Sequence, residues 1–141
     1  DENFLVMNGD LLTNILFKDF ISYHLECQND VSVCVFKKEV KIDLGVLQLA
    51  DSGQIKDYIE KPTYNFNVSM GIYAMNRSIC EIIPDSTHFD LPDLVKILIS
   101  SENSKLGAYK FDGIWLDIGR PDDYQLTLDI FENEDKEQFL Q

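Results

Sequence analysis

Two aspartates, Asp10 and Asp117, each stand where a short apolar segment gives way to a turn or a helix. Ligands of α/β proteins bind at strand ends of this kind, and carboxylate oxygens are the ligands that hard divalent cations prefer. The pair therefore predicts one divalent metal ion held between two strand ends. The alternative is that each aspartate is an ordinary turn or helix-cap residue, which is the commoner role of aspartate at such places.

The elements that would position Asp10 are a strand, a helix and a second strand. Residues 4–7 are a continuous apolar run, which predicts a central parallel strand buried on both faces. Apolar residues recur at helical spacing over residues 14–26, and residues 31–36 are rich in β-branched side chains. Together these segments predict a β-α-β unit.

Two β-hairpins are predicted farther along the chain. Residues 44–49 and 55–59 flank a segment that contains aspartate and glycine, which suit a tight reversal. Residues 106–111 and 114–118 flank an Asp-Gly dipeptide, which is typical of a type I′ turn. The second hairpin would end on Asp117.

One strand and three helices complete the prediction. Pro62 lacks the amide that a sheet needs, so it ends the first hairpin, and residues 68–75 resume as a strand. Residues 77–83 predict a short helix, and Asp90 and Pro92 are suited to begin a longer one. Pro121 is suited to begin a last helix, with the acidic pair Asp122 and Asp123 in its first turn and an apolar face made of Tyr124, Leu128 and Phe131.

Composition limits the class of protein. With 45% hydrophobic and 11% aromatic residues, the chain is globular. A formal net charge of −13 would repel nucleic acid and anionic membranes, so neither is expected as a partner. No apolar run approaches the roughly 20 residues of a membrane span, and a cytoplasmic location is expected. The three cysteines lack C-x-x-C spacing and predict buried free thiols rather than a disulfide or zinc site.

The chain is expected to be one domain or part of one. No repeat, low-complexity segment or composition shift marks a linker. Asp1 stands directly before a strand of the buried type without an initiator methionine, which suggests a piece excised from a longer protein. Residues 1–131 are expected to form the partial domain, and the acidic residues 132–141 a frayed tail.

Four motifs, taken in order, carry a resemblance to a known family. They are G-D at residues 9–10, E-K-P at 60–62, N-V-S-M-G-I-Y at 67–73 and W-L-D-I-G-R-P-D-D-Y at 115–124. From residue 4 to about residue 131 the chain resembles the sugar-1-phosphate nucleotidylyltransferases, of the mannose-1-phosphate guanylyltransferase-like or glucose-1-phosphate thymidylyltransferase-like kind. The resemblance implies the C-terminal portion of a three-layer α/β/α, Rossmann-like nucleotidyltransferase sandwich, with a mixed sheet and antiparallel hairpins.

The resemblance also implies roles for individual residues. Asp10 and Asp117 would hold Mg²⁺, and Lys61 would approach the sugar phosphate. Glu60 would accept hydrogen bonds from sugar hydroxyls. The sugar pocket would be completed by Gly45, Val68 and Gly71, with Asn67 as a weaker candidate and Trp115 as a core residue that could also shape the pocket.

One part of the family pattern is missing. The glycine-rich loop that grips the nucleoside triphosphate would require a G-x-G, and this chain has none. The intact protein is therefore expected to convert a sugar 1-phosphate and a nucleoside triphosphate into a nucleotide sugar and pyrophosphate, and this chain alone is expected to be inactive. The open edge of the strand at residues 4–7 predicts a homo-oligomer.

Two other functions compete with this one. The first is a regulatory or binding subunit that keeps the nucleotidyltransferase-like fold without turnover. The chain keeps Asp10, Glu60, Lys61 and Asp117 together. This argues against a regulatory subunit, since a protein without turnover would be expected to have lost at least one of these residues. The second is a metal-dependent glycosyltransferase, whose usual D-x-D motif is absent.

Overall fold

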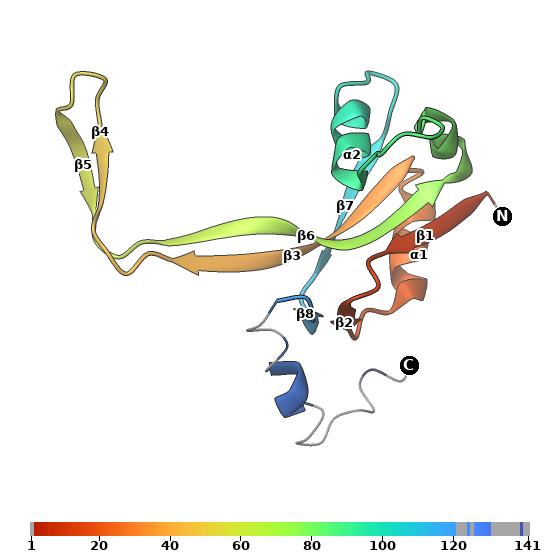
Figure 1. Cartoon of the computed structure of the whole chain (residues 1–141), viewed down its shortest axis with the longest axis horizontal. Coiled ribbons are helices and arrows are strands. Elements are labelled where there is room, and N and C mark those ends of the chain that lie inside the picture. The colour runs from red at the N-terminus through yellow and green to blue at the C-terminus, as the bar shows by residue number, and fades with distance from the viewer. Residues whose placement is uncertain (1, 121–123, 125, 131–138, 140–141) are drawn as a thin grey trace. The chain divides into compact units, whose positions relative to one another are not determined.

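The computed structural model describes residues 2–120, 124, 126–130 and 139, and the chain divides into two compact units (Figure 1). Residues 1–36 and 69–141 form the core unit, and residues 37–68 form the hairpin unit. The expectation of one partial domain over residues 1–131 stays a prediction. The boundary lies inside two continuous strands, β3 (Val31–Lys41) and β6 (Thr63–Asn76), so no linker composition marks it.

The core unit is built on a four-stranded mixed sheet in the order β1-β6-β3-β7 (Figure 1). β3 pairs in parallel with β7 (Leu106–Phe111), whereas β1 (Asn3–Met7) pairs antiparallel with β6. The prediction of a central parallel strand at residues 4–7 is therefore wrong, since β1 is an edge strand of the described sheet. A run of four apolar residues does not specify the partner strand, which comes from a segment about 70 residues later.

Helices cover both faces of this sheet. On one face, Met70, Ile72 and Ala74 of β6 pack with Phe20 of α1 (Phe17–Glu26). The other face is covered by η1 (Arg77–Ile82) and α2 (Leu91–Ile99), through a cluster of Tyr73, Met75, Ile79, Leu94 and Leu98. Alternate residues of β6 thus face opposite layers, as the period of a strand requires. The predicted three-layer α/β/α class with a mixed sheet is confirmed.

The second predicted hairpin is wrong, and its two halves lie in different sheets. β7 pairs with β3, while β8 (Trp115–Asp117) pairs antiparallel with β2 (Leu11–Thr13), a strand that sequence analysis missed. A type I′ turn needs a positive φ at both central residues, and neither Asp112 nor Gly113 has one. The dipeptide therefore marks the place where the chain leaves one sheet for the other.

The first predicted hairpin is confirmed in the hairpin unit. β4 (Val46–Leu49) and β5 (Ile55–Ile59) form an antiparallel two-stranded sheet. The reversal is closed by two backbone hydrogen bonds between Ala50 and residues 53 and 54, and Gly53 supplies the positive φ of +81°. No residue from 37 to 68 is buried.

The helices lie near their predicted positions, but the predicted capping bond and the burial of the last helix differ. α2 begins after Asp90, but the Asp90 side chain makes no capping hydrogen bond. Residues 124 and 126–130 are helical, yet Tyr124 and Leu128 are exposed and Thr127 is buried, so the predicted apolar face is wrong. Residues 121–123, Phe131 and all of the predicted tail except Phe139 lie outside the described residues. Among the helices of the described part, none is long and apolar enough to cross a membrane.

Candidate functional site

The two predicted metal ligands are brought together by the pairing of β2 with β8. Asp10 directly precedes β2, and the next residue, Leu11, is the register partner of Asp117. The backbone N–H of Ile118 donates a hydrogen bond to the carbonyl oxygen of Asp10, with an N to O distance of 2.9 Å. Two residues more than 100 positions apart thus lie side by side at one sheet end.

The side chains of this pair converge on one point beside Gly119. A Cβ atom placed on Gly119 would lie 3.2 Å from Oδ2 of Asp10 and 3.2 Å from Oδ1 of Asp117. The backbone N–H of Gly119 donates to Oδ1 of Asp117 at 3.1 Å, which helps to fix the second carboxylate. The side chain of Asp10 is exposed and that of Asp117 is half-buried.

This arrangement fits a hard divalent cation that shares its coordination with a substrate. Mg²⁺ commonly takes one or two protein carboxylates together with phosphate oxygens and water. The described residues contain no group of three or more His, Cys, Asp or Glu side chains that could hold a metal ion alone. A pair of carboxylates is therefore the donor set that these residues offer.

Gly71 is joined to Asn8, two residues before Asp10, and has a backbone conformation that favours glycine. Its φ is +73°, and a Cβ there would lie 2.7 Å from Nδ2 of Asn8. The backbone N–H of Asn8 donates to the Gly71 carbonyl oxygen at 3.0 Å. Asn8 was not among the predicted site residues, although its place two residues before Asp10 is a signal that could have found it.

Trp115 stabilises the same region from the core side. Its indole Nε1–H donates to the carbonyl oxygen of Met70 at 3.2 Å, and its ring centroid lies 5.5 Å from that of Phe36. The side chain is partly buried and packs against the core cluster that includes Met70 and Ile72. Trp115 thus fixes the residue directly before Gly71.

In the hairpin unit, the side chain of Tyr58 lies against Gly45 and forms a hydrogen bond with Glu60. The hydroxyl of Tyr58 donates to Oε2 of Glu60 at 2.8 Å, and this contact with a carboxylate raises the pKa of Tyr58. A Cβ on Gly45 would collide with the Tyr58 ring. Gly45 therefore leaves room for an aromatic side chain that sequence analysis did not single out.

Lys61 is held in an unusual backbone conformation directly after Glu60. Its φ is +45°, a region that non-glycine residues rarely adopt. The carbonyl oxygen of Pro62 accepts a hydrogen bond from the N–H of Ile42 at 3.0 Å, which ties the end of the E-K-P segment to the residue directly after β3. Such conformations cost on the order of 1–3 kcal/mol and cluster at ligand-binding sites.

The predicted site residues thus fall into two groups, one in each unit. The core unit contains Asp10, Gly71, Trp115 and Asp117. The hairpin unit contains Gly45, Glu60, Lys61, Asn67 and Val68, the last two lying on β6 with exposed and half-buried side chains respectively.

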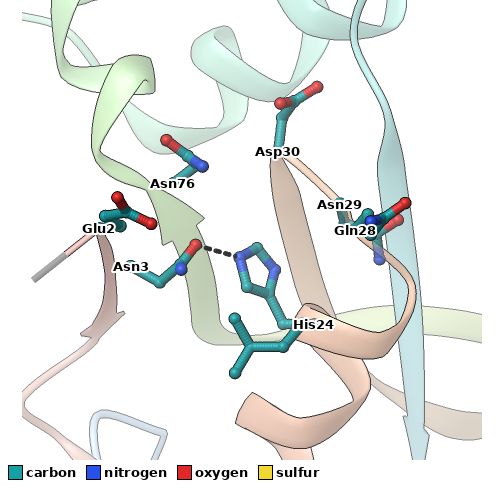
Figure 2. Close-up of a pocket in the computed structure, with 8 residues that line it drawn as sticks. Glu2, Asn3, His24, Gln28, Asn29, Asp30 and Asn76 are labelled. Atoms are coloured by element: carbon teal, nitrogen blue, oxygen red, sulfur yellow. Dashed lines mark hydrogen bonds between the residues drawn. The ribbon is translucent and has the colours of Figure 1, made fainter.

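A separate polar cavity of about 320 Å³ lies at the opposite end of β1, and none of the predicted site residues lines it (Figure 2). His24 is buried there, with Nε2 3.1 Å from Oδ1 of Asn3 and Nδ1 2.9 Å from Oγ of Ser32. Asn29 also donates to Ser32 Oγ at 3.0 Å. These bonds tie α1 to β1 and β3, which is a structural role.

Known proteins are similar to this chain in both sequence and fold. The profile of the family described as nucleotidyl transferase matches residues 1–133. A mannose-1-phosphate guanylyltransferase catalytic subunit beta of Drosophila melanogaster is 30% identical over 87% of this chain and 33% of its own length. A glucose-1-phosphate adenylyltransferase of Bacillus cereus is 31% identical over 84% of this chain and 34% of its own length. The chain thus spans about a third of these relatives.

Solved structures agree in fold. HddC of Yersinia pseudotuberculosis matches with a TM-score of 0.63 and 23% identity, over 93% of this chain and 56% of that one. A putative glucose-1-phosphate thymidylyltransferase of Bacillus anthracis matches with a TM-score of 0.65 and 16% identity, over 98% and 58%. At these identities the likeness shows the fold alone. The matched profile, which covers nearly all of the sequence, shows the family: this chain belongs to the nucleotidyl transferases.

Proposed function

We propose that the full-length protein is a sugar-1-phosphate nucleotidylyltransferase, which joins a sugar 1-phosphate to a nucleoside triphosphate and releases pyrophosphate. The observation that carries the proposal is the convergence of Asp10 and Asp117 beside Gly119. Relatives that are named for this reaction on mannose 1-phosphate and glucose 1-phosphate support the substrate class. They differ in both sugar and nucleotide, so the proposal stops at the class.

In this proposal Asp10 and Asp117 hold Mg²⁺ at the end of β2 and β8. Held there, Mg²⁺ would supply positive charge against the charge that develops on the phosphate oxygens. The two carboxylates do no acid-base chemistry. Their contribution is to fix an anion-binding position on a chain whose net charge of −13 would otherwise repel phosphate.

The remaining residues orient the sugar phosphate. Lys61 approaches its phosphate, and Glu60 accepts hydrogen bonds from its hydroxyls. In the core unit, the backbone at Gly71 and the Trp115 that supports it are candidate sugar contacts. In the hairpin unit, the further candidates are Gly45, Asn67 and Val68. An oxygen of the sugar phosphate then attacks the α-phosphate of the nucleotide in line, and the rate enhancement comes from positioning and charge neutralisation.

The test is pyrophosphate release by the full-length protein and its Asp10→Asn and Asp117→Asn variants. Each change removes an anionic ligand at almost constant volume. We expect turnover to fall by about 100–1000-fold, the usual cost of losing one preorganised electrostatic group, with an unchanged melting temperature. Near-normal activity of either variant at limiting Mg²⁺ would remove that residue from the metal site.

A non-catalytic regulatory subunit is the second candidate function. It predicts the same fold and no pyrophosphate release by the wild-type protein with any sugar phosphate. The sequence of the full-length protein discriminates, because an intact glycine-rich loop with its arginine favours the enzyme and a degraded loop favours the regulatory subunit.

The proposal also includes the cellular location of the protein and its partners. A cytoplasmic location fits Cys27, Cys34 and Cys80, all of which are free thiols. Only Cys34 is buried, however, so the expectation of three buried thiols is wrong. A homo-oligomer is also part of the proposal, and nucleic acid and membranes are not among its partners.

A further inference from the structure

Tyr58 and Glu60 lie on the same side of the hairpin at the point where the E-K-P segment begins. Tyr58 belongs to β5 and Glu60 follows directly after that strand, and side chains two positions apart in a strand point to the same face. The Tyr58 hydroxyl donates a hydrogen bond to Oε2 of Glu60 at 2.8 Å. This contact joins a tyrosine that has no role in the proposed function to a carboxylate that does.

The Glu60 side chain depends on this one contact for a fixed orientation. In the described part of the chain, Tyr58 is its hydrogen-bond donor, and no lysine or arginine forms an ion pair with it. An exposed glutamate without a partner samples several rotamers, because its side chain has several rotatable bonds. An ionised carboxylate accepts hydrogen bonds at both oxygens. The bond from Tyr58 to Oε2 thus leaves Oε1 to accept from the hydroxyls of a ligand.

Gly45 leaves the space in which the Tyr58 ring lies. It stands two residues before Leu47, the register partner of Tyr58, and diagonal neighbours of this kind are within reach of an aromatic side chain. The register is regular here, since its irregularity lies at the far end of β4. The three atoms nearest to a Cβ placed on Gly45 all belong to Tyr58, and this Cβ would collide with the ring. A side chain at residue 45 would therefore displace the ring together with the hydroxyl that holds Glu60.

We propose that Tyr58 is a positioning residue for the sugar 1-phosphate: its hydroxyl orients the Glu60 carboxylate toward the sugar hydroxyls, and Gly45 leaves the room that its ring requires. This role rests on the proposed function, which assigns Glu60 to the sugar hydroxyls. In this role Gly45 is not a direct contact of the sugar but acts through Tyr58. The contact with Glu60 also raises the pKa of Tyr58, so the hydroxyl keeps its proton and remains a donor at neutral pH.

The first experiment compares Tyr58→Phe, Glu60→Ala and the double variant in the full-length protein. Pyrophosphate release is measured with a panel of sugar 1-phosphates that includes glucose 1-phosphate and mannose 1-phosphate. Tyr58→Phe keeps the ring beside Gly45 and removes only the hydroxyl. We expect it to lower kcat/KM for the preferred sugar 1-phosphate by about 3–10-fold, the effect of one hydrogen bond, and to leave KM for the nucleoside triphosphate unchanged. In the Glu60→Ala background Tyr58→Phe should have no further effect, because Tyr58 acts through that carboxylate.

The second experiment tests the space beside Gly45. Gly45→Ala should lower the same kcat/KM in the wild type, because the added Cβ displaces the Tyr58 ring. In a Tyr58→Ala background the space is vacant, and Gly45→Ala should have no further effect. Tyr64→Phe is the control and should keep wild-type kinetics, since the Tyr64 hydroxyl, exposed in the same unit, makes no hydrogen bond among the described residues.

Four results would overturn this role of Tyr58 and leave the proposed function in place, because the wild-type protein would still turn over. They are wild-type kinetics of Tyr58→Phe, wild-type kinetics of Glu60→Ala, an equal loss from Tyr58→Phe with and without Glu60→Ala, and an equal loss from Gly45→Ala with and without Tyr58→Ala. If Gly45→Ala does not fold, the cycle of Tyr58→Phe with Glu60→Ala decides by itself. Absence of pyrophosphate release by the wild type with every sugar 1-phosphate of the panel would overturn the proposed function and this role with it.

Discussion

At the scale of single residues, the backbone of Lys61 is the clearest sign of a constrained site outside the aspartate pair. Lys61 is not a glycine, so its positive φ is strained, and its side chain is exposed. Strain of this kind persists only where the surroundings hold it in place. Gln28 and Ser86 also have a positive φ, so the feature supports a site at Lys61 only together with its place between Glu60 and Pro62.

Lys61→Ala should lower kcat/KM for the sugar phosphate by about 10–100-fold, the cost of one hydrogen bond to a charged group. The melting temperature should not change because the side chain is exposed. Lys56→Ala, which removes another exposed lysine of the hairpin unit at an ordinary φ, is the matched control. Glu60→Gln should mainly change selectivity among sugar phosphates. Unchanged kinetics across a panel of sugar phosphates would remove both residues from the site.

His24 should make stability depend on pH. Burial lowers the pKa of His24 below its usual 6.5, although the nearby Asp30 carboxylate opposes that shift. The unfolded chain then binds a proton more readily than the folded one, so this contribution to stability is present above pH 6.5 and is lost as pH falls through the lower folded value. His24→Gln keeps a polar group beside Asn3 and Ser32 but cannot titrate.

The melting temperature should therefore fall more between pH 7.5 and pH 5.5 in the wild type than in His24→Gln, because only the wild type must protonate a buried imidazole. The carboxylates that also titrate toward this range are the same in both proteins and cancel in the comparison. Equal pH dependence of the two proteins would show that His24 does not contribute.

At the scale of elements, the site depends on one short pairing. β2 and β8 have three residue pairs, and this pairing brings Asp10, directly before β2, to the same place as Gly119, two residues after β8. Gly119 has an ordinary negative φ, so its importance lies in the space that it leaves between the two carboxylates.

Gly119→Ala should lower activity at limiting Mg²⁺ with little effect on stability. The added Cβ would lie 3.2 Å from an oxygen of each carboxylate. The exposed side chain of Asp10 can move away at small cost to folding, but not while it binds one ion together with Asp117. Gly9→Ala is the control because a Cβ there would meet no atom within 4 Å. A Gly119→Ala variant with the Mg²⁺ dependence of the wild type would show that the carboxylates do not act together at this point.

At the scale of the whole molecule, we expect nucleotide binding to need more than this chain contains. The family's glycine-rich loop has no counterpart in the 141 residues, and the described cavities are not lined by a loop of that kind. We expect titration calorimetry to detect weak or no nucleoside triphosphate binding by this chain, and clear binding by the full-length protein. Tight binding by this chain alone would show that the core unit holds the nucleotide by other means.

The sequence by itself determined the local features: the hairpin at β4 and β5, the positions of α1 and α2, and the aspartates that end apolar segments. Each depends on the spacing of apolar residues or on turn residues within about 15 positions. The tertiary structure decided which segments pair. It made β1 an antiparallel edge strand, split residues 106–118 between two sheets, paired β2 with β8, and divided the chain inside two strands. Strand pairing joins residues that are far apart in the sequence, and local patterns carry no information about the partner. The convergence of Asp10 with Asp117 follows from such a pairing, and so only the folded chain shows it.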